Sequence, residues 1–240
     1  MKALILAGGL GTRLRPFTFA IPKPLLPIGD KPILHIILSQ MRNAGIDEIV
    51  LATGYQAELI RAFCGDGSRF GVRISYVHEE SPLGTAGPLA LARSHFGRDE
   101  TFLLMNGDVI TQLDLRAFLE AGIGNGCELT VGYTKHVYQS PYGVLTIAGD
   151  LVKGIAEKPS QEYAISTGIY CVAATALDLI PDDAFFTMPD LVQSLLSAGR
   201  KVAAHYVKDC WTGIETVEHL DDVLKELNKL PVEAFAGKVS

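Results

Sequence analysis

The sequence lacks any long hydrophobic run. None of its 240 residues lies in a stretch that approaches the roughly 20 uninterrupted apolar residues of a membrane span, although 48% of the residues are hydrophobic. The apolar run at residues 3–7 is short and ends at the glycine pair Gly8-Gly9, which argues against a signal peptide. A soluble protein that does not bind membranes is therefore predicted.

Cysteine and positive charge are also scarce. The four cysteines lie far apart, without the spacing of zinc ligands or of a dense disulfide framework, so free thiols and a cytoplasmic location are expected. The formal net charge of −6 argues against nucleic-acid binding. An anionic substrate would instead need local positive charge, which Arg13, Arg15, Lys23 and Lys31 supply within one segment.

In the first half of the chain, short apolar runs alternate with helical patterns. This alternation is typical of strand-helix-strand units and a largely parallel sheet. The predicted strands are residues 3–7, 48–52, 73–77 and 101–105, and the predicted helices are residues 32–44, 57–63, 85–95 and 114–121.

From residue 128 onward the pattern changes to strands with few helices between them. Strands are predicted at residues 129–133, 143–147, 152–155, 165–172 and 202–207, and helices at residues 188–197 and 217–229. We expect this half of the sheet to be mixed or antiparallel, and we expect one domain rather than two.

A glycine-rich loop follows the first predicted strand. Residues Gly8-Gly9-Leu10-Gly11-Thr12-Arg13 lie where ligands bind in open α/β sheets, and glycine lets backbone N–H groups approach phosphate oxygens. A dinucleotide-binding loop would continue into a helix, which Pro16, Pro22, Pro24 and Pro27 forbid. The Gly-Lys-Ser/Thr ending of a kinase-type loop is missing as well. A glycine-rich turn without a ligand stays open, although the nearby cations disfavour it.

This loop belongs to a longer pattern. Residues 8–16 (Gly-Gly-Leu-Gly-Thr-Arg-Leu-Arg-Pro) are followed by residues 22–27 (Pro-Lys-Pro-Leu-Leu-Pro) and by Lys31-Pro32. The pattern resembles the signature of the sugar-1-phosphate nucleotidylyltransferases and is most similar to that of the mannose-1-phosphate guanylyltransferases. Later motifs of that family appear in the same order over nearly the whole chain.

The resemblance implies an α/β fold, a Rossmann-like three-layer nucleotidyltransferase domain with a mixed, mainly parallel central sheet. We expect this single domain to span residues 1–230, with 1–127 mainly binding the nucleotide, 128–230 mainly binding the sugar phosphate, and 231–240 forming a frayed tail. The C-terminal left-handed β-helix of many relatives is expected to be missing, because no hexapeptide repeat occurs. The oligomeric state stays open, with a homo-oligomer as one option.

The resemblance also implies a nucleotide site and a catalytic set. Arg13 would grip the triphosphate, Lys23 would neutralise the region of the α-phosphate, and Asp108 would hold Mg²⁺. The expected nucleotide-binding residues are Leu6, Ala7, Gly8, Gly9, Gly11, Thr12, Arg13, Lys23, Glu79, Gly84, Thr85 and Gly107.

Glu79 matches the position from which a side chain of the family reaches the edge of the base. A carboxylate accepts from guanine N1–H and N2–H₂ together, so GTP is favoured. Uracil and thymine also offer an N–H donor, and a solvated Glu79-Glu80 pair at a strand end is the structural alternative, so the base stays open.

Two further segments match the sugar-phosphate site of the family. Tyr142-Gly143-Val144 and Glu157-Lys158-Pro159 imply that Gly143, Glu157 and Lys158 bind the sugar phosphate, with Glu157 accepting from hydroxyls and Lys158 meeting the phosphate. Taken alone, Glu157-Lys158 is an ordinary exposed charge pair. Ser166 and Thr167 match a strand that lines the sugar, but guanylyltransferases often have Asn-Ala there. A substrate like mannose 1-phosphate is favoured, and the sugar stays open.

The segment Cys210-Trp211-Thr212-Gly213-Ile214-Glu215-Thr216 departs most from the family pattern. The family places its second metal-binding aspartate where Gly213 stands. We expect Asp108 and the triphosphate to hold Mg²⁺, with Glu215 or Asp209 assisting. The alternative is impaired catalysis.

The expected reaction is attack by an oxygen of a sugar 1-phosphate on the α-phosphorus of a nucleoside triphosphate, with loss of pyrophosphate. No protein nucleophile is needed, because a phosphate monoester is mostly dianionic at neutral pH. Two other classes stay open: a nucleotide-sugar-dependent glycosyltransferase, and a non-catalytic regulatory paralogue that binds a nucleotide sugar. The N-terminal cations suit a nucleoside triphosphate, which disfavours the glycosyltransferase. Glycine in place of the aspartate at position 213 supports the non-catalytic paralogue.

Overall fold

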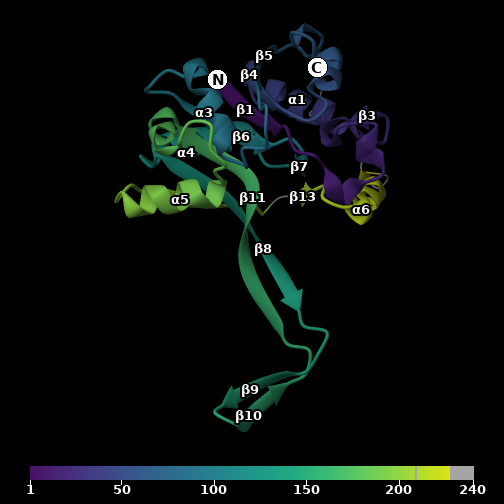
Figure 1. Ribbon diagram of the computed structural model, residues 1–240, viewed down its shortest axis with the longest axis vertical. Helices are drawn as coiled ribbons and strands as arrows, with labels where there is room; N and C mark the ends of the chain where they lie inside the picture. Colours follow the sequence, from purple (N-terminus) through teal and green to yellow (C-terminus); the bar gives the residue numbers. More distant parts are fainter. Residues whose placement is uncertain (209, 228–240) are drawn as a thin grey trace.

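The computed structural model describes residues 1–208 and 210–227, whose centre is a seven-stranded sheet (Figure 1). The strand order is β12-β8-β11-β6-β1-β4-β5. The strands are β1 (Lys2–Ala7), β4 (Glu48–Thr53), β5 (Arg73–His78), β6 (Thr101–Asn106), β8 (Leu129–Gln139), β11 (Ser160–Ala173) and β12 (Val202–Tyr206).

The pairing directions divide the sheet into two parts. Strand β1 pairs in parallel with β4 and β6, and β4 pairs in parallel with β5. Strand β11 runs antiparallel to both β6 and β8, and β12 is parallel to β8. The predicted mixed, mainly parallel sheet is confirmed, including the antiparallel character of the second half.

Helices cover both faces of the sheet because consecutive residues of its central strands, which point to opposite faces, are apolar. In β1, Ala3 and Ile5 pack on one face and Leu4 on the other, all fully buried. The first face is covered by α1 (Ile33–Asn43), α2 (Ala57–Cys64), α4 (Leu115–Gly124) and α6 (Val217–Leu227); the second is covered by α3 (Gly87–Leu91) and α5 (Met188–Ser197). This is the expected three-layer arrangement.

Short elements fill the proline-rich N-terminal region and connect the layers. Two small ribbons form, one from β2 (Pro27–Ile28) with β3 (Lys31–Pro32) and one from β7 (Val109–Thr111) with β13 (Trp211–Gly213). The single turns of 3₁₀-helix are η1 (Thr12–Leu14), η2 (Phe17–Phe19), η3 (Lys23–Leu25), η4 (Ser68–Phe70) and η5 (Arg93–His95), and η6 (Ala174–Leu179) is longer. The prolines confine residues 12–32 to such short pieces.

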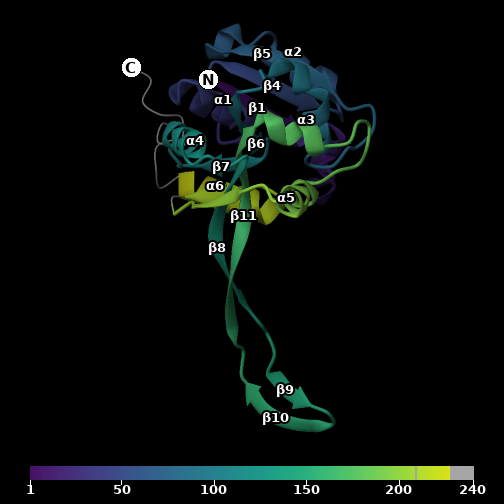
Figure 2. The same ribbon diagram turned by 90° about the vertical axis from the view of Figure 1, so that its left-hand side faces the viewer.

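Strands β8 and β11 extend beyond the sheet into a projecting arm, which we define as residues 137–163 (Figures 1 and 2). Their ladder is continuous from Tyr133 opposite Ser166 to Gln139 opposite Ser160. The far end of the arm is a separate hairpin of β9 (Val144–Ala148) and β10 (Leu151–Ala156), whose side chains are almost all exposed.

Several element boundaries differ from those predicted. Strands β8 and β11 are longer than residues 129–133 and 165–172, because their antiparallel ladder continues into the arm. The helix predicted at 85–95 is reduced to α3 and η5. Its first residues are tied to the loop before α5, where Thr85 Oγ1 accepts from Met188 N (2.8 Å) and Ala86 N donates to Phe186 O (2.9 Å).

The last predicted helix is observed as far as Leu227. Lys229 and the predicted tail at 231–240 lie outside the described residues, as does Asp209. Among the helices of the described segments, none combines the length and the hydropathy that crossing a bilayer requires.

Candidate functional site

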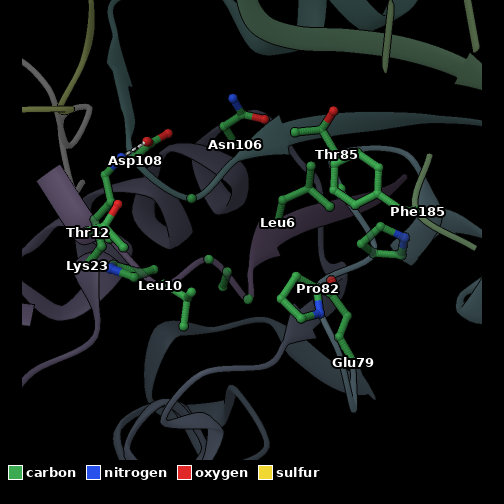
Figure 3. A pocket seen from close by; sticks show the side chains of 18 residues that line it. Leu6, Leu10, Thr12, Lys23, Glu79, Pro82, Thr85, Asn106, Asp108 and Phe185 are labelled. Atoms are coloured by element: carbon green, nitrogen blue, oxygen red, sulfur yellow. Dashed lines mark hydrogen bonds and ion pairs between the residues drawn. The ribbon is translucent and has the colours of Figure 1, made fainter. Parts of the chain in front are cut away.

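The carboxyl ends of β1 and β6 meet at a cavity of about 390 Å³ (Figure 3). The wall on one side is the glycine-rich loop of residues 8–12, and Lys23 and Asp108 lie beside it. Eleven of the twelve predicted nucleotide-binding residues line this cavity: Leu6, Ala7, Gly8, Gly9, Gly11, Thr12, Lys23, Glu79, Gly84, Thr85 and Gly107. The twelfth, Arg13, lines an adjoining hollow together with Lys23 and Glu215.

The backbone of the glycine-rich loop is free to bind an anion. Among the described residues, the N–H groups of Gly9, Leu10 and Gly11 have no acceptor in the backbone hydrogen bonds. The loop is fixed from behind, because Thr18 Oγ1 donates to Gly11 O (2.8 Å) and Gly11 has a left-handed φ of 59°. Clustered, oriented N–H groups of this kind form a concave site for phosphate oxygens.

Two ion pairs hold the expected catalytic side chains. Lys23, from η3, pairs with Asp108, which lies in the turn between β6 and β7. Arg13, from η1, pairs with Glu215, which follows β13. The partners of the first pair are 85 residues apart in the sequence, and those of the second pair are 202 residues apart. Tertiary folding therefore brings these side chains together.

Gly213 lies directly beside the expected metal ligand. It pairs with Val109 in the β7-β13 ribbon, and Ile214 N donates to Asp108 O (2.9 Å). A Cβ placed on Gly213 would come no closer than 3.7 Å to any atom, that atom being Cζ2 of Trp211. The Cβ of an aspartate would therefore meet no obstacle here, at a position that lines the same cavity as Asp108.

Glu79 forms the opposite end of the cavity. Figure 3 shows Glu79, Pro82 and Phe185 at one end and Thr12, Lys23 and Asp108 at the other. Glu79 Oε2 accepts from Leu83 N (3.3 Å), and burial raises the pKa of the Glu79 carboxyl. A Cβ on Gly8 would lie 2.2 Å from Glu79 Oε1, so this carboxylate packs directly against the glycine-rich loop.

Gly107 shows why small residues surround this cavity. Its N–H donates to Leu6 O (2.8 Å), and a Cβ at this position would lie only 2.6 Å from the same oxygen. Since β1 and β6 approach so closely here, only glycine fits between the strand end and Asp108.

A second cavity, of about 440 Å³, lies on the other side of Asp108. Ser166 and Thr167 line it together with Trp211 and Gly213. The Thr167 hydroxyl donates to Gly132 O (2.8 Å), and Trp211 Nε1 donates to Thr167 O (2.7 Å). Ser166 Oγ lies 2.8 Å from the Tyr170 hydroxyl. None of the described residues that line this cavity is a lysine or an arginine; two of them are histidines, His136 and His219.

The other expected sugar-phosphate residues lie elsewhere. Gly143, Glu157 and Lys158 are all in the arm, and none of them lines either cavity. Glu157 and Gly143 are close together, because a Cβ on Gly143 would lie 3.2 Å from Glu157 Oε2. Within one chain, the structure does not bring these three residues to Ser166 and Thr167.

Some lining residues were not in the predicted set. Asn106 belongs to the Asn-Gly-Asp turn, whose position at a strand end was the available signal. Phe185 comes from the loop before α5, and its side chain is 69% exposed at the rim of the first cavity. No local pattern marks Phe185, since only the tertiary fold brings its loop there.

The family model for nucleotidyl transferases matches residues 2–229. The chain belongs to this family. It is 40% identical over 187 residues to a probable mannose-1-phosphate guanylyltransferase 1 of Oryza sativa, covering 75% of this chain and 52% of the relative. It is also 40% identical over 183 residues to the mannose-1-phosphate guanylyltransferase catalytic subunit beta of Danio rerio, covering 74% and 51%. The chain spans about half the length of these curated relatives.

Two solved structures share the fold over nearly the whole chain. A putative glucose-1-phosphate thymidylyltransferase from Bacillus anthracis superposes with a TM-score of 0.79 at 26% identity, covering 99% of this chain and 100% of that one. HddC from Yersinia pseudotuberculosis, complexed with GMP-PN, superposes with a TM-score of 0.73 at 26% identity, covering 94% and 99%. The first neighbour is named as a thymidylyltransferase and the second is complexed with GMP-PN, so the common fold does not by itself select the base.

Proposed function

We propose that the protein transfers the nucleotidyl group of a nucleoside triphosphate, preferably GTP, to a sugar 1-phosphate like mannose 1-phosphate, and releases pyrophosphate. The observation that carries this proposal is the first cavity, with free loop N–H groups and Lys23 at one end and the Glu79 carboxylate at the other. A nucleotide has the same polarity, with phosphates at one end and a hydrogen-bonding base at the other.

The preference for GTP rests on Glu79 and on the relatives. An ionised carboxylate accepts two hydrogen bonds side by side, which matches the N1–H and N2–H₂ donors of guanine. The curated relatives are named as guanylyltransferases, and the solved HddC complex contains a guanine nucleotide analogue. Pro82 and Phe185 provide apolar surface beside Glu79 on which a base can lie.

The residues present suit Mg²⁺ held by one protein carboxylate and the phosphates of the substrate. Mg²⁺ is usually bound by one or two carboxylates, by substrate phosphates and by water, and Asp108 is such a carboxylate at the phosphate end. No cluster of three potential metal ligands occurs in the described residues. Bound there, Mg²⁺ would neutralise phosphate charge. Glu215 is engaged with Arg13, so we assign it no metal.

The work of the chain in this reaction is positioning and charge compensation. The loop N–H groups and Lys23 hold the triphosphate with its α-phosphorus toward the second cavity, where the sugar 1-phosphate binds beside Ser166 and Thr167. The attacking phosphate oxygen forms the new bond to the α-phosphorus while the bond to pyrophosphate breaks. Arg13 and Lys23 stabilise the negative charge that builds up on the leaving pyrophosphate.

A pyrophosphate-release screen tests this function. The five common nucleoside triphosphates are each combined with glucose, mannose, galactose and heptose 1-phosphates in the presence of Mg²⁺. We expect the highest kcat/KM with GTP and a manno-configured sugar. Release that requires no sugar 1-phosphate, or no release from any pair, would contradict the proposal.

Gly213 favours a second candidate, a paralogue that binds a nucleotide sugar without catalysis. Calorimetric titration with GDP-sugars distinguishes the two functions. Tight binding together with no pyrophosphate release from any pair would support the second candidate.

A further inference from the structure

The arm exposes a large apolar surface. Among the described residues, ten of the twenty-one exposed large hydrophobic side chains lie in the arm. In the hairpin, Val152 pairs with Ile147 and Ile155 with Leu145, so these four side chains share one face, and they are 48–70% exposed. Contiguous exposed apolar surface of this kind marks an interaction site.

An isolated two-stranded hairpin is at best marginally stable in water, so the hairpin requires a covering surface. Its own domain does not supply one. The straight ladder of β8 and β11 carries the hairpin away from the sheet in both views (Figures 1 and 2). The arm therefore needs a partner.

The second cavity offers a sugar 1-phosphate little positive charge. Among its described lining residues are the carboxylates of Asp108, Glu215 and Asp222 and the imidazoles of His136 and His219, but no lysine or arginine. Lys23 and Arg13 already pair with two of these carboxylates, Asp108 and Glu215. A dianionic phosphate would thus find no lysine or arginine in the described lining to pair with.

The arm carries the complementary groups. Lys153 and Lys158 are exposed, and Lys158 has a left-handed φ of 44°, which is uncommon for a residue other than glycine and concentrates at functional sites. An exposed apolar strip, Phe17, Phe19 and Ile21, lies next to the glycine-rich loop on the body of the molecule. One copy thus has the apolar strip and a cavity with no lysine or arginine in its described lining, and the arm of another copy has the apolar face and the cations.

We propose that two copies of this chain exchange arms, so that the arm of each copy closes the second cavity of the other and contributes Lys158 and Glu157 to its sugar-phosphate site. This inference rests on the proposed function. Reciprocal exchange of one element closes a two-fold dimer and leaves no free arm. Covering by a different protein, or folding of the arm onto its own domain, is an outcome that the experiments below detect.

The first experiment needs no enzymatic activity. We expect a mass of about twice 25.9 kDa by light scattering. The double variant Ile147→Lys, Ile155→Lys should be monomeric and correctly folded, because both side chains are exposed in the single chain. Leu59→Lys, at an exposed position in α2, is the matched control and should remain dimeric. A monomeric wild-type protein would overturn the proposal.

Trp211 reports where the arm docks. It is the single tryptophan of the chain and lines the second cavity. Acrylamide should quench its fluorescence more strongly in the double variant than in the wild type, because the arm of the partner then no longer covers the cavity. Equal quenching in both would show a dimer whose arms do not reach the second cavity, and would also overturn the proposal.

Mixing two inactive variants tests whether Lys158 acts in the partner. Lys23→Ala has a defective body and an intact arm, and Lys158→Ala has the reverse. Equal co-expression gives half mixed dimers, each with one intact site of two, so about a quarter of the wild-type activity should return. No recovery from two inactive variants, or full activity of Lys158→Ala alone, would contradict the exchange. An inactive wild-type protein that passes the mass and quenching tests would reject only the proposed reaction.

Discussion

The body of the molecule and the arm are both built from strands, but these strands have opposite surroundings. In the body, β1 and β6 are buried on both faces, and Asp108, in the turn after β6, is paired with Lys23. Strands β8 and β11 begin in the sheet and continue into the arm, where almost every side chain is exposed. Strand formation is thus a local property of the sequence, whereas burial depends on what the fold brings to each face.

Truncating one large side chain in each region gives the greatest contrast in stability. Phe102 is fully buried and stacks on Phe96 at 3.8 Å between ring centroids. Phe102→Ala should lower the free energy of unfolding by about 3–5 kcal/mol. Leu151→Ala, at a 63% exposed arm position opposite the apolar face, should change it by less than about 0.5 kcal/mol. Urea unfolding followed by circular dichroism checks both; a comparable loss from Leu151→Ala would mean that this side of the arm is also covered.

Catalysis is expected to depend on the body cation Lys23. Lys23→Ala should lower kcat at least about a hundredfold, because a charge-compensating group at the reacting phosphates is lost. Lys201→Ala, at an exposed position directly before β12 and outside both cavities, is the control and should retain near-normal turnover. Steady-state pyrophosphate release measures both, and near-normal turnover of Lys23→Ala would refute its role.

Replacing Glu79 should weaken the binding of GTP but stabilise the folded protein. Glu79→Gln should raise KM for GTP about tenfold, because an amide cannot accept from both guanine donors with one group. Calorimetric titration with a non-hydrolysable GTP analogue compares the affinities of the wild type and Glu79→Gln directly. An unchanged ratio of GTP to UTP efficiency would remove Glu79 from base recognition.

The pH dependence follows from the raised pKa of the Glu79 carboxyl. The folded protein keeps this proton to a higher pH than the unfolded chain, so stability is lost as pH rises through the raised pKa. Glu79→Gln should therefore have a higher Tm at neutral pH, with a smaller advantage as pH falls and Glu79 becomes protonated. GTP affinity of the wild type should decrease over that same acidic range. Thermal scans from pH 5 to 8 check the sign.

The smallest effect is expected at Gly213. Gly213→Asp should lower the Mg²⁺ concentration for half-maximal activity by roughly threefold to tenfold, because it adds a second carboxylate to the cavity that Asp108 lines. Gly124→Asp, at an equally open position at the end of α4, should leave the Mg²⁺ titration unchanged. An unchanged titration for Gly213→Asp would show that this position does not influence the metal.

The sequence predicted most elements of the fold because local rules decide them. Apolar periodicity located α1, α5 and the four parallel strands to within one or two residues. It failed at residues 85–95, where the loop before α5 captures the first residues of the expected helix. It also could not predict the arm, because alternation indicates a strand without saying whether another layer covers it.

The site was predictable where one segment carries it. The loop at residues 8–12 and Lys23 are close in sequence, and their glycines, prolines and charge indicate an anion site. The pairing of Arg13 with Glu215 and the position of Phe185 depend on contacts between distant segments, which no local pattern encodes. The positions of Glu157 and Lys158 depend on the direction of the arm, which only the assembled sheet defines.

The Lys23-Asp108 pair has a consequence for the order in which ligands enter. A polyphosphate arriving alone would compete with Asp108 for Lys23 and would face a released carboxylate, while a free cation would compete with Lys23 for Asp108. A preformed complex of cation and polyphosphate offers a cation to Asp108 and a phosphate to Lys23 at the same time. Neither side chain is then left with an unpaired charge. By linkage, each component should then bind more tightly in the presence of the other. The Lys23-Asp108 pair thereby discriminates against either component by itself.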